Sequence, residues 1–385
     1  MRRLLLPLAL VACAPGLPPA TAQGLHERAA TFDLEDSTSA PGELAALAAI
    51  AGAARVLALG QPGPGSHELP RLLHRLFQHL SEQSGFTGLA LVTDSRAALR
   101  LDAYVQGGTQ DLDAALLGLG DRGLATTELR ALLTWARERN ASGLQPPLRV
   151  FGLDPRDPDA AAAIVLAYLE RTDPSYVLKA RSLLAGDRPL GVEAVLTHLD
   201  EGRAALVAAS DADSWALVRQ QAELVAQARR MSESWEFEAG EFARARNVEW
   251  ALTQLGPRGK LLVWADNLGV AAQVLGSAPA MGDFLRQWLA ADYVAIATSV
   301  ADGGHLVVRD AETVCGARLP PPRPGSLDAA LAGPLPVTLV DLRTRHDPAL
   351  AAAQRLRSFA DGSVGDLRVR PALAFDALVG LRDAH

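Results

Sequence analysis

The residues best suited to acid–base chemistry gather in one short stretch, where Ser66, His67 and Glu68 follow one another. A histidine acts as a general base near neutral pH, and a neighbouring carboxylate holds its ring and stabilises its charged form. A serine beside such a base is a candidate nucleophile. His74, about two helical turns further on, is a second candidate base. These residues make hydrolysis a chemistry that the chain could carry.

The same residues also have structural interpretations. Ser66 is a typical helix N-cap, and Glu68 is favourable in the first turn beside the positive end of the helix dipole. His74 is offset by one residue from the apolar Leu73, which is typical of a partly exposed helix position. Both interpretations therefore stand at this point.

Two aspartates extend the candidate site. Asp94 and Asp266 follow predicted strands, and ligands of open parallel sheets bind beyond the carboxyl ends of the strands. A base at His67 with a carboxylate at Asp266 is therefore conceivable. A metal would need several converging ligands, which the sequence does not establish, so neither a metal nor a cofactor is expected.

The elements that must position these residues alternate between short β-type runs and amphipathic helical runs, which favours an α/β fold. The predicted strands comprise residues 55–59, 88–92, 148–153, 260–264, 293–299, 304–309, 337–340 and 377–381. Between 154 and 256 only helical periodicity is present, for example at Leu217, Leu224 and Val225. We expect a mostly parallel sheet with helices on both faces and a helical insertion at about 155–256.

The N-terminus has the pattern of an export signal, with Arg2 and Arg3 before an apolar stretch too short to span a bilayer. Cleavage after Ala22 would remove residues 1–22 and leave a domain at 23–385. The run that ends at Cys13 instead resembles a lipobox, in which Cys13 would carry a lipid anchor. Both sites remain open, and either predicts a periplasmic, membrane-anchored or secreted protein of a bacterial envelope.

Composition restricts the function classes. The 385 residues include 49% hydrophobic side chains, which excludes a disordered chain. With 37 basic and 44 acidic residues the net charge is −7, so a nucleic-acid partner is not expected. A small-molecule ligand remains, with membrane contact only through a lipid at Cys13. The sequence does not determine the oligomeric state.

Several motifs, in order and spacing, resemble the erythromycin esterase family over nearly the whole chain. The family pattern Leu-Gly-Glu-x-x-His-Gly-Ser-x-Glu-Phe corresponds to residues 59–69, which read LGQPGPGSHEL. Further family-like stretches are residues 71–77, 85–86, 135–140, 150–154, 167–174, 247–250, 263–267, 281–282 and 375–379. The resemblance implies hydrolysis of a macrolide ester by water that a histidine activates and carboxylates orient.

The positions that the resemblance assigns to this chemistry are all substituted. They hold Gln61 for a glutamate, Pro64 for a histidine, Val92 for a glutamate, and Asp266 and Gly269 for two histidines. Neither a proline nor a glycine has a side chain that accepts a proton. We therefore expect a catalytically degenerate family member that binds a ligand or acts as a scaffold. The alternative is an active ester hydrolase with a rearranged site at His67 and neighbouring carboxylates.

Overall fold

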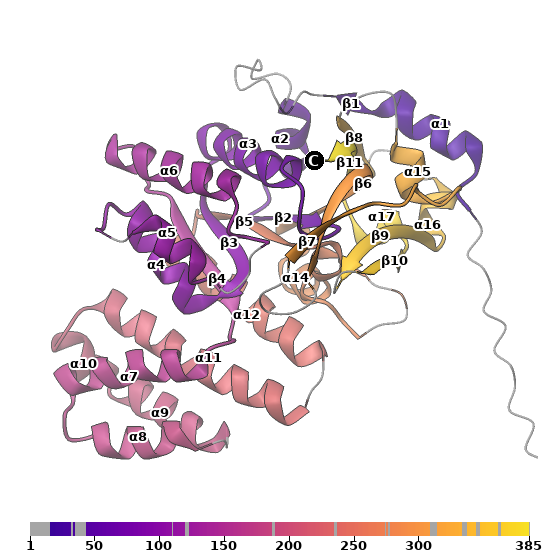
Figure 1. Ribbon diagram of the computed structural model, residues 1–385. Helices are drawn as coiled ribbons and strands as arrows, with labels where there is room; N and C mark the ends of the chain where they lie inside the picture. The colour runs from indigo at the N-terminus through magenta and orange to yellow at the C-terminus, as the bar shows by residue number, and fades with distance from the viewer. Residues whose placement is uncertain are drawn as a thin grey trace, which may run out of the picture.

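The structure is a computed structural model. It describes residues 16–384 except 32–33, 35–43, 110, 120–122, 187–188, 235–236, 274, 276–277, 309–313, 333–336, 344–346 and 361–362. Cys13 and the rest of residues 1–15 lie outside the described residues. A mixed sheet crosses the centre of the molecule, and helices cover it (Figure 1).

The main sheet has the strand order β1-β8-β11-β6-β2-β5-β3-β4, with β7 paired to β6. Six neighbouring strands, from β11 to β4, are parallel, and β1, β7 and β8 are antiparallel to their partners. The strands are β1 (Ala30–Thr31), β2 (Val56–Gln61), β3 (Phe86–Asp94), β4 (Arg149–Asp154), β5 (Lys260–Asp266), β6 (Tyr293–Val308), β7 (Val314–Arg318), β8 (Val337–Asp341) and β11 (Ala377–Ala384). The predicted, mostly parallel α/β fold is confirmed.

Alternate residues of the central strands feed two separate apolar cores, one on each face of the sheet. In β2, Leu57 and Leu59 pack into the first core, and Val56 and Ala58 into the second. This alternation follows from the two-residue repeat of a strand, and buried parallel strands are apolar on both faces. Helices therefore cover both faces, as the sequence predicts.

The first core lies under helices that belong mostly to the N-terminal half of the chain. These are α2 (Ala45–Ala51), α3 (Glu68–Gln83), α4 (Ser95–Val105), α5 (Leu112–Leu117) and α6 (Thr127–Ala141). The other face carries α1 (Pro19–Arg28), α12 (Phe237–Leu255), α13 (Asn267–Val270), α14 (Met281–Leu289), α15 (Leu327–Leu331), α16 (Pro348–Ala351) and α17 (Pro371–Ala374). The exposed 3-10 turn Ala290–Asp292 follows α14.

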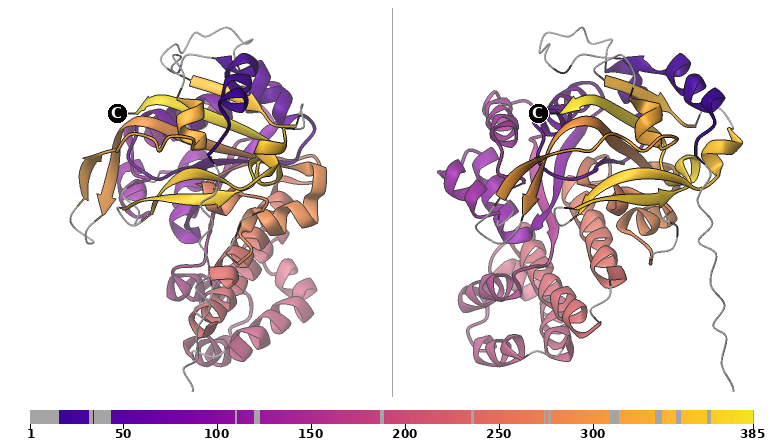
Figure 2. Two further views of the ribbon diagram at one scale, coloured as in Figure 1. Left: turned by 90° about the vertical axis from the view of Figure 1, so that its right-hand side faces the viewer. Right: turned by 45° about the vertical axis from the view of Figure 1, so that its right-hand side comes forward.

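Between β4 and β5 the described chain forms only helices, and most of them gather beyond the β4 edge of the sheet (Figure 1 and Figure 2). They are α7 (Pro158–Thr172), α8 (Val177–Ala185), α9 (Pro189–Glu201), α10 (Arg203–Ala208), α11 (Ala212–Ser234) and α12. Residues of α7 to α11, such as Val165, Leu199 and Val225, form a third apolar core of their own. We call the helices α7 to α11 the helical layer.

Three details differ from the sequence-based prediction. The predicted strands 293–299 and 304–309 are one continuous strand, β6, as far as Val308, and residue 309 is not described. A hairpin of β9 (Gln354–Ala360) and β10 (Ser363–Val369), and the short strands β1 and β7, were not predicted. The β9–β10 hairpin carries charged side chains at Arg355, Arg357 and Asp366, so it lacks the apolar run by which buried strands are found.

The segment around the predicted cleavage site after Ala22 is folded onto the domain. Leu17 and Leu25 are buried, and the Leu17 N–H donates to the Gly325 carbonyl at 2.7 Å. Ala22 itself lies within α1. Within the described part of the chain, no helix is both long and apolar enough to cross a membrane.

Candidate functional site

The carboxyl ends of the parallel strands bring residues from distant parts of the chain to one edge. In the strand register Gln61, the last residue of β2, lies opposite Asp266, the last residue of β5. Asp94 at the end of β3 is likewise opposite Asp154 at the end of β4. We call the region around these four residues the carboxyl edge. It is where an open parallel sheet places its ligand site.

A buried amide fixes the geometry at the end of β5. The Asn267 side chain donates to the Thr298 carbonyl at 2.8 Å and accepts from the Thr298 N–H at 3.1 Å, which joins α13 to β6. Gly60 permits this approach, because a Cβ there would lie 2.5 Å from Asn267 Oδ1. The adjacent Asp266 carboxylate then caps α13 by accepting the Gly269 N–H at 2.6 Å.

A buried charge cluster stands beside this cap. Arg244 on α12 donates through Nε to Asp154 Oδ1 at 3.0 Å and through Nη1 to Glu241 Oε1. Asp154 is 1% exposed and Glu241 2% exposed. Arg156 also pairs with Asp154 Oδ2 at 2.5 Å, and Glu241 Oε2 accepts the Met281 N–H at 2.9 Å. Protein groups thus hydrogen-bond both of these buried carboxylates.

The pKa directions reflect this arrangement. Burial raises the pKa of the Glu241 carboxyl, and the charge of Asp266 acts in the same direction, while Arg244 and the Met281 N–H oppose it. For Arg244 burial alone would lower the pKa, but the charges of Asp154 and Glu241 outweigh burial and raise it. Arg244 therefore remains a permanent cation between two acids.

Gly269 lies between two of the acids. A Cβ added at this position would be 3.4 Å from Asp266 Oδ1 and 3.6 Å from Glu241 Oε2, which are ordinary contact distances. A side chain at position 269 would therefore meet both carboxylates.

His67 is held by a carboxylate from another element. Its Nδ1 lies 2.6 Å from Glu128 Oε1, at the first turn of α6. The histidine side chain is 58% exposed and the Glu128 side chain 9% exposed. Burial raises the pKa of Glu128, but its hydrogen bond to His67 and its own backbone lower it, and the net direction is down. The carboxylate thus holds the histidine ring by its Nδ1 and leaves Nε2 outside this contact.

His74, within α3, has a different environment. Its ring centroid lies 5.7 Å from that of Trp135 on α6, and its Nε2 is buried with no hydrogen-bond partner among the described residues. Burial lowers the pKa of His74 to about 4, so the ring is neutral at neutral pH.

The other predicted residues have local contacts. Ser66 Oγ accepts the Leu69 N–H at 3.3 Å, and Glu68 lies in the first turn of α3, as expected for the helix-capping interpretation. Asp94 caps α4 by accepting the Ala97 N–H at 3.0 Å. Val92 packs partly buried against the second core, and Pro64 is partly buried in the loop after β2.

The structure thus places Gln61 opposite Asp266 in the strand register, and it places His67 within hydrogen-bond distance of Glu128. Among the contacts of the described residues, none links His67 or His74 to Asp94 or Asp266. No group of three or more His, Cys, Asp or Glu side chains within the described ranges is arranged to hold a metal ion.

Sequence reasoning missed Glu128, Asp154, Glu241 and Arg244. Glu241 and Arg244 are three residues apart on a predicted helix, a spacing that signals an ion pair but not its burial. Nothing in the sequence indicates that Asp154 lies beside that pair, because it is 90 residues from Arg244.

Comparison with known proteins places this site in context. The sequence model of the erythromycin esterase family matches residues 81–384, so the match begins beyond Gln61 and Pro64. A solved Bacillus cereus protein is 21% identical, with a TM-score of 0.83, and the alignment covers 95% of this chain and 97% of that one. A succinoglycan biosynthesis protein is 19% identical with a TM-score of 0.82 and the same two coverages. A variant of the erythromycin esterase EreC in its open conformation is 17% identical with a TM-score of 0.72, covering 92% of this chain and 97% of that one. At these identities the structures show a shared fold.

Proposed function

Because the chain belongs to the erythromycin esterase family, we propose that it is an exported member that binds a small molecule at the carboxyl edge without hydrolysing it. The family resemblance predicted from the sequence motifs is confirmed, and the loss of hydrolysis is the proposal. The observation that carries it is that Gln61 and Asp266 lie opposite each other in the strand register. The sequence resemblance predicts a glutamate and a histidine at these two positions.

The chemistry of the other groups supports this proposal. A general base must be able to take a proton from water near the working pH. At the carboxyl edge the Asp154 and Glu241 carboxylates are bonded to Arg244, and the Asp266 carboxylate caps α13. His26, His67, His74, His79 and His198 are the histidines whose side chains are described, and none of their contacts is with Gln61 or Asp266.

The test compares the natural protein with a variant in which the family residues are restored. We expect the purified protein to bind erythromycin in isothermal titration calorimetry and to leave erythromycin and p-nitrophenyl acetate intact. Turnover should be restored in a variant that combines five substitutions: Gln61→Glu, Pro64→His, Val92→Glu, Asp266→His and Gly269→His. A side chain at position 269 would lie beside Glu241 and the residue at position 266, where a carboxylate can orient a histidine. Ester hydrolysis by the natural protein would contradict the proposal.

A second candidate function rests on the His67–Glu128 contact. A partly buried carboxylate that binds Nδ1 leaves Nε2 of an exposed imidazole to activate water or a serine, as in a catalytic dyad. Under this alternative the protein is an active ester hydrolase with a rearranged site. Ser66 is the adjacent hydroxyl, although its Oγ already accepts a bond from Leu69.

Two substitutions separate the candidates. If the natural protein hydrolyses p-nitrophenyl acetate, His67→Ala should abolish turnover, and Glu128→Gln should lower kcat by about 10²-fold or more because the ring loses its orienting charge. His79→Ala, within the helix α3 that follows His67, serves as the control. Activity that survives His67→Ala would place the chemistry on other residues.

Export belongs to the same proposal, and the packing of the N-terminal helix favours one processing site. Cleavage after Ala22 would cut α1 and remove the buried Leu17 with its bond to Gly325. Cleavage before Cys13 would leave this packing intact and allow lipid attachment to Cys13. Mass spectrometry of the mature N-terminus should therefore find lipidated Cys13. The Cys13→Ala variant lacks the lipid anchor and should be found either free of the membrane or with its signal segment uncleaved. A mature chain that begins at Gln23 would contradict this.

A further inference from the structure

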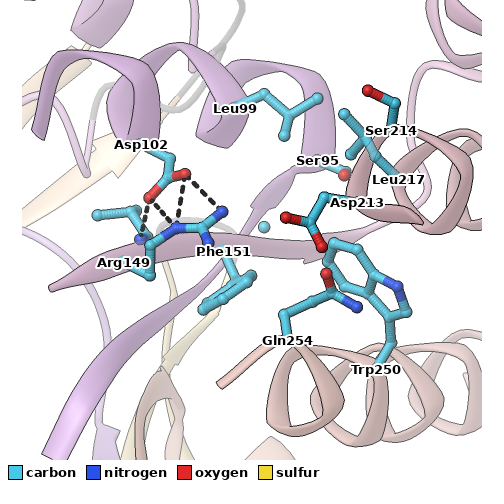
Figure 3. Close-up of a pocket in the computed structure, with 12 residues that line it drawn as sticks. Ser95, Leu99, Asp102, Arg149, Phe151, Asp213, Ser214, Leu217, Trp250 and Gln254 are labelled. Carbon is cyan, nitrogen blue, oxygen red and sulfur yellow. Dashed lines mark hydrogen bonds and ion pairs between the residues drawn. The ribbon is translucent and has the colours of Figure 1, made fainter. Parts of the chain in front are cut away.

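A separate pocket of about 370 Å³ lies beside β4, between α4 and the helices α11 and α12 (Figure 3). β4 is the last strand at this side of the main sheet. We call this the side pocket. Its lining residues include none of the four that define the carboxyl edge, Gln61, Asp94, Asp154 and Asp266, although Ser95 directly follows Asp94.

One wall of the side pocket is a neutralised ion pair. Arg149 Nε lies 3.1 and 3.0 Å from the two oxygens of Asp102, and Arg149 Nη2 lies 2.9 Å from Oδ2. Asp102 Oδ1 also accepts the Val150 N–H at 2.8 Å and so provides a hydrogen-bond partner for this backbone group of the edge strand β4. Asp102 is 7% exposed. This pair builds the wall and contributes no net charge.

The remaining polar groups are open to the pocket. Neither the exposed Asp213 carboxylate nor the Ser95 hydroxyl has a hydrogen-bond partner among the described residues. Gln254 donates a hydrogen bond from Nε2 to Thr253 Oγ1 at 3.3 Å. Its Oε1 has no donor among the described residues and can accept a hydrogen bond from a ligand. In Figure 3 the Asp213 carboxylate points from α11 towards the space between Ser95 and Gln254. The pocket therefore offers acceptors and donors from several sides.

An aromatic wall completes the pocket. Trp250 on α12 is half-buried and meets Phe151 of β4 edge to face, with ring centroids 5.9 Å apart. Trp250 Nε1 has no protein partner among the described residues and adds a donor. Leu99 and Leu217 extend the apolar surface. Directed polar groups beside an aromatic and aliphatic surface are typical of a small-molecule site.

We propose that the side pocket binds a neutral sugar, a pyranose ring or a disaccharide. Each sugar hydroxyl both donates and accepts, which matches the mixture of Asp213, Gln254, Ser95 and the Trp250 N–H. The C–H face of the ring is apolar and suits the indole of Trp250. The one uncompensated charge, on Asp213, disfavours anions. An organic cation would use the acceptors alone and leave the donors unpaired.

Ligand-observed saturation-transfer NMR on the purified protein tests this with D-glucose, D-galactose, lactose and cellobiose as probes. We expect saturable binding in the millimolar range for at least one of them. Trp250→Ala should weaken that binding about tenfold or more, and Trp250→Phe, which keeps an aromatic ring against Phe151, should weaken it less. Asp213→Asn should also weaken it, because the charged acceptor is lost.

The matched control is Asp159→Asn. Asp159 is also an exposed aspartate in the first turn of a helix, α7, but it lies outside the pocket. It should leave sugar binding unchanged. Circular dichroism of each variant verifies folding, and tetramethylammonium serves as the cationic probe.

Three outcomes would overturn the proposal. One is the absence of saturable transfer to all four sugars. Another is sugar binding that Trp250→Phe, Trp250→Ala and Asp213→Asn leave unchanged in folded protein. The third is binding of tetramethylammonium, lost in Asp213→Asn, without any sugar binding. Because the pocket is separate from the carboxyl edge, these results do not depend on whether the protein hydrolyses esters.

Discussion

The carboxyl edge and the side pocket are both rich in polar side chains, but these side chains are used differently. At the carboxyl edge, Asp154 and Glu241 are bonded to Arg244, and Asp266 caps a helix. At the side pocket, Asp213 and the hydroxyl of Ser95 have no protein partner among the described residues.

This difference distinguishes polar side chains that are paired within the protein from polar side chains that a ligand could bind. A buried charge without a partner costs several kcal/mol, so the groups around Arg244 are needed to compensate one another. A partly exposed polar group can be solvated by water, so leaving it unpaired costs little, and it is free to bind a ligand. Substitutions at the carboxyl edge should therefore change stability most, and those at the side pocket should change binding.

The largest effect is expected from Arg244→Met. It leaves the buried carboxylates of Asp154 and Glu241 without their shared cation, which should lower the free energy of unfolding by about 3–5 kcal/mol. Arg246→Met is the control on the same helix, because Arg246 is 57% exposed and pairs with Glu249 on the surface. That change should cost less than about 1 kcal/mol. Urea unfolding measures both, and equal losses would contradict the assignment.

His74 should make stability depend on pH. Its pKa falls from 6.5 to about 4 on burial, so the unfolded chain binds the proton more tightly. The stabilisation is present above pH 6.5 and is lost as the pH falls towards 4, by on the order of 3 kcal/mol. His74→Leu should flatten urea-unfolding free energies over this range, whereas His26→Gln, at an exposed position, should not. An unchanged slope in His74→Leu would refute the prediction.

Two neighbouring glutamines of α11 should respond in opposite directions. Both amide atoms of Gln221 are buried without a partner among the described residues, and Gln221→Met should stabilise the protein by about 1 kcal/mol. The Gln220 amide donates to Asn247 Oδ1 at 2.7 Å, and Gln220→Met should destabilise it by about 1–3 kcal/mol. Melting temperatures by circular dichroism test the pair. A loss of stability in Gln221→Met would mean that its amide has a partner.

The smallest effect on stability is expected at the side pocket. Asp213→Asn removes an exposed carboxylate with no protein partner among the described residues, so the unfolding free energy should change by less than about 0.5 kcal/mol. The same variant should bind sugar more weakly. A large fall in its melting temperature would show that Asp213 serves the fold and would remove the contrast between the two regions.

Much of the fold could be predicted from the chain because its strands are short, apolar and bounded by helical periodicity. β2, β3, β4, β5, β8 and β11 lie where apolar runs predict strands. The β9–β10 hairpin could not be found this way, since arginines and Asp366 interrupt its pattern. The candidate site was less predictable. Asp266 could be predicted as a site residue because it follows a predicted strand. Glu128 could not, because it reaches His67 only when α6 packs beside α3.

The sequence by itself determined the alternation of strands and helices and the family, because periodicity and motif spacing are local properties of the chain. The sequence resemblance also predicts that the family's acids and histidines are replaced here by Gln61, Pro64, Val92, Asp266 and Gly269. Only the tertiary structure decided the partners of the remaining charges. Asp154 meets Arg244 across 90 residues and His67 meets Glu128 across 61, because strand order and helix packing set these distances. The side pocket likewise exists only where the helical layer meets the edge of the sheet.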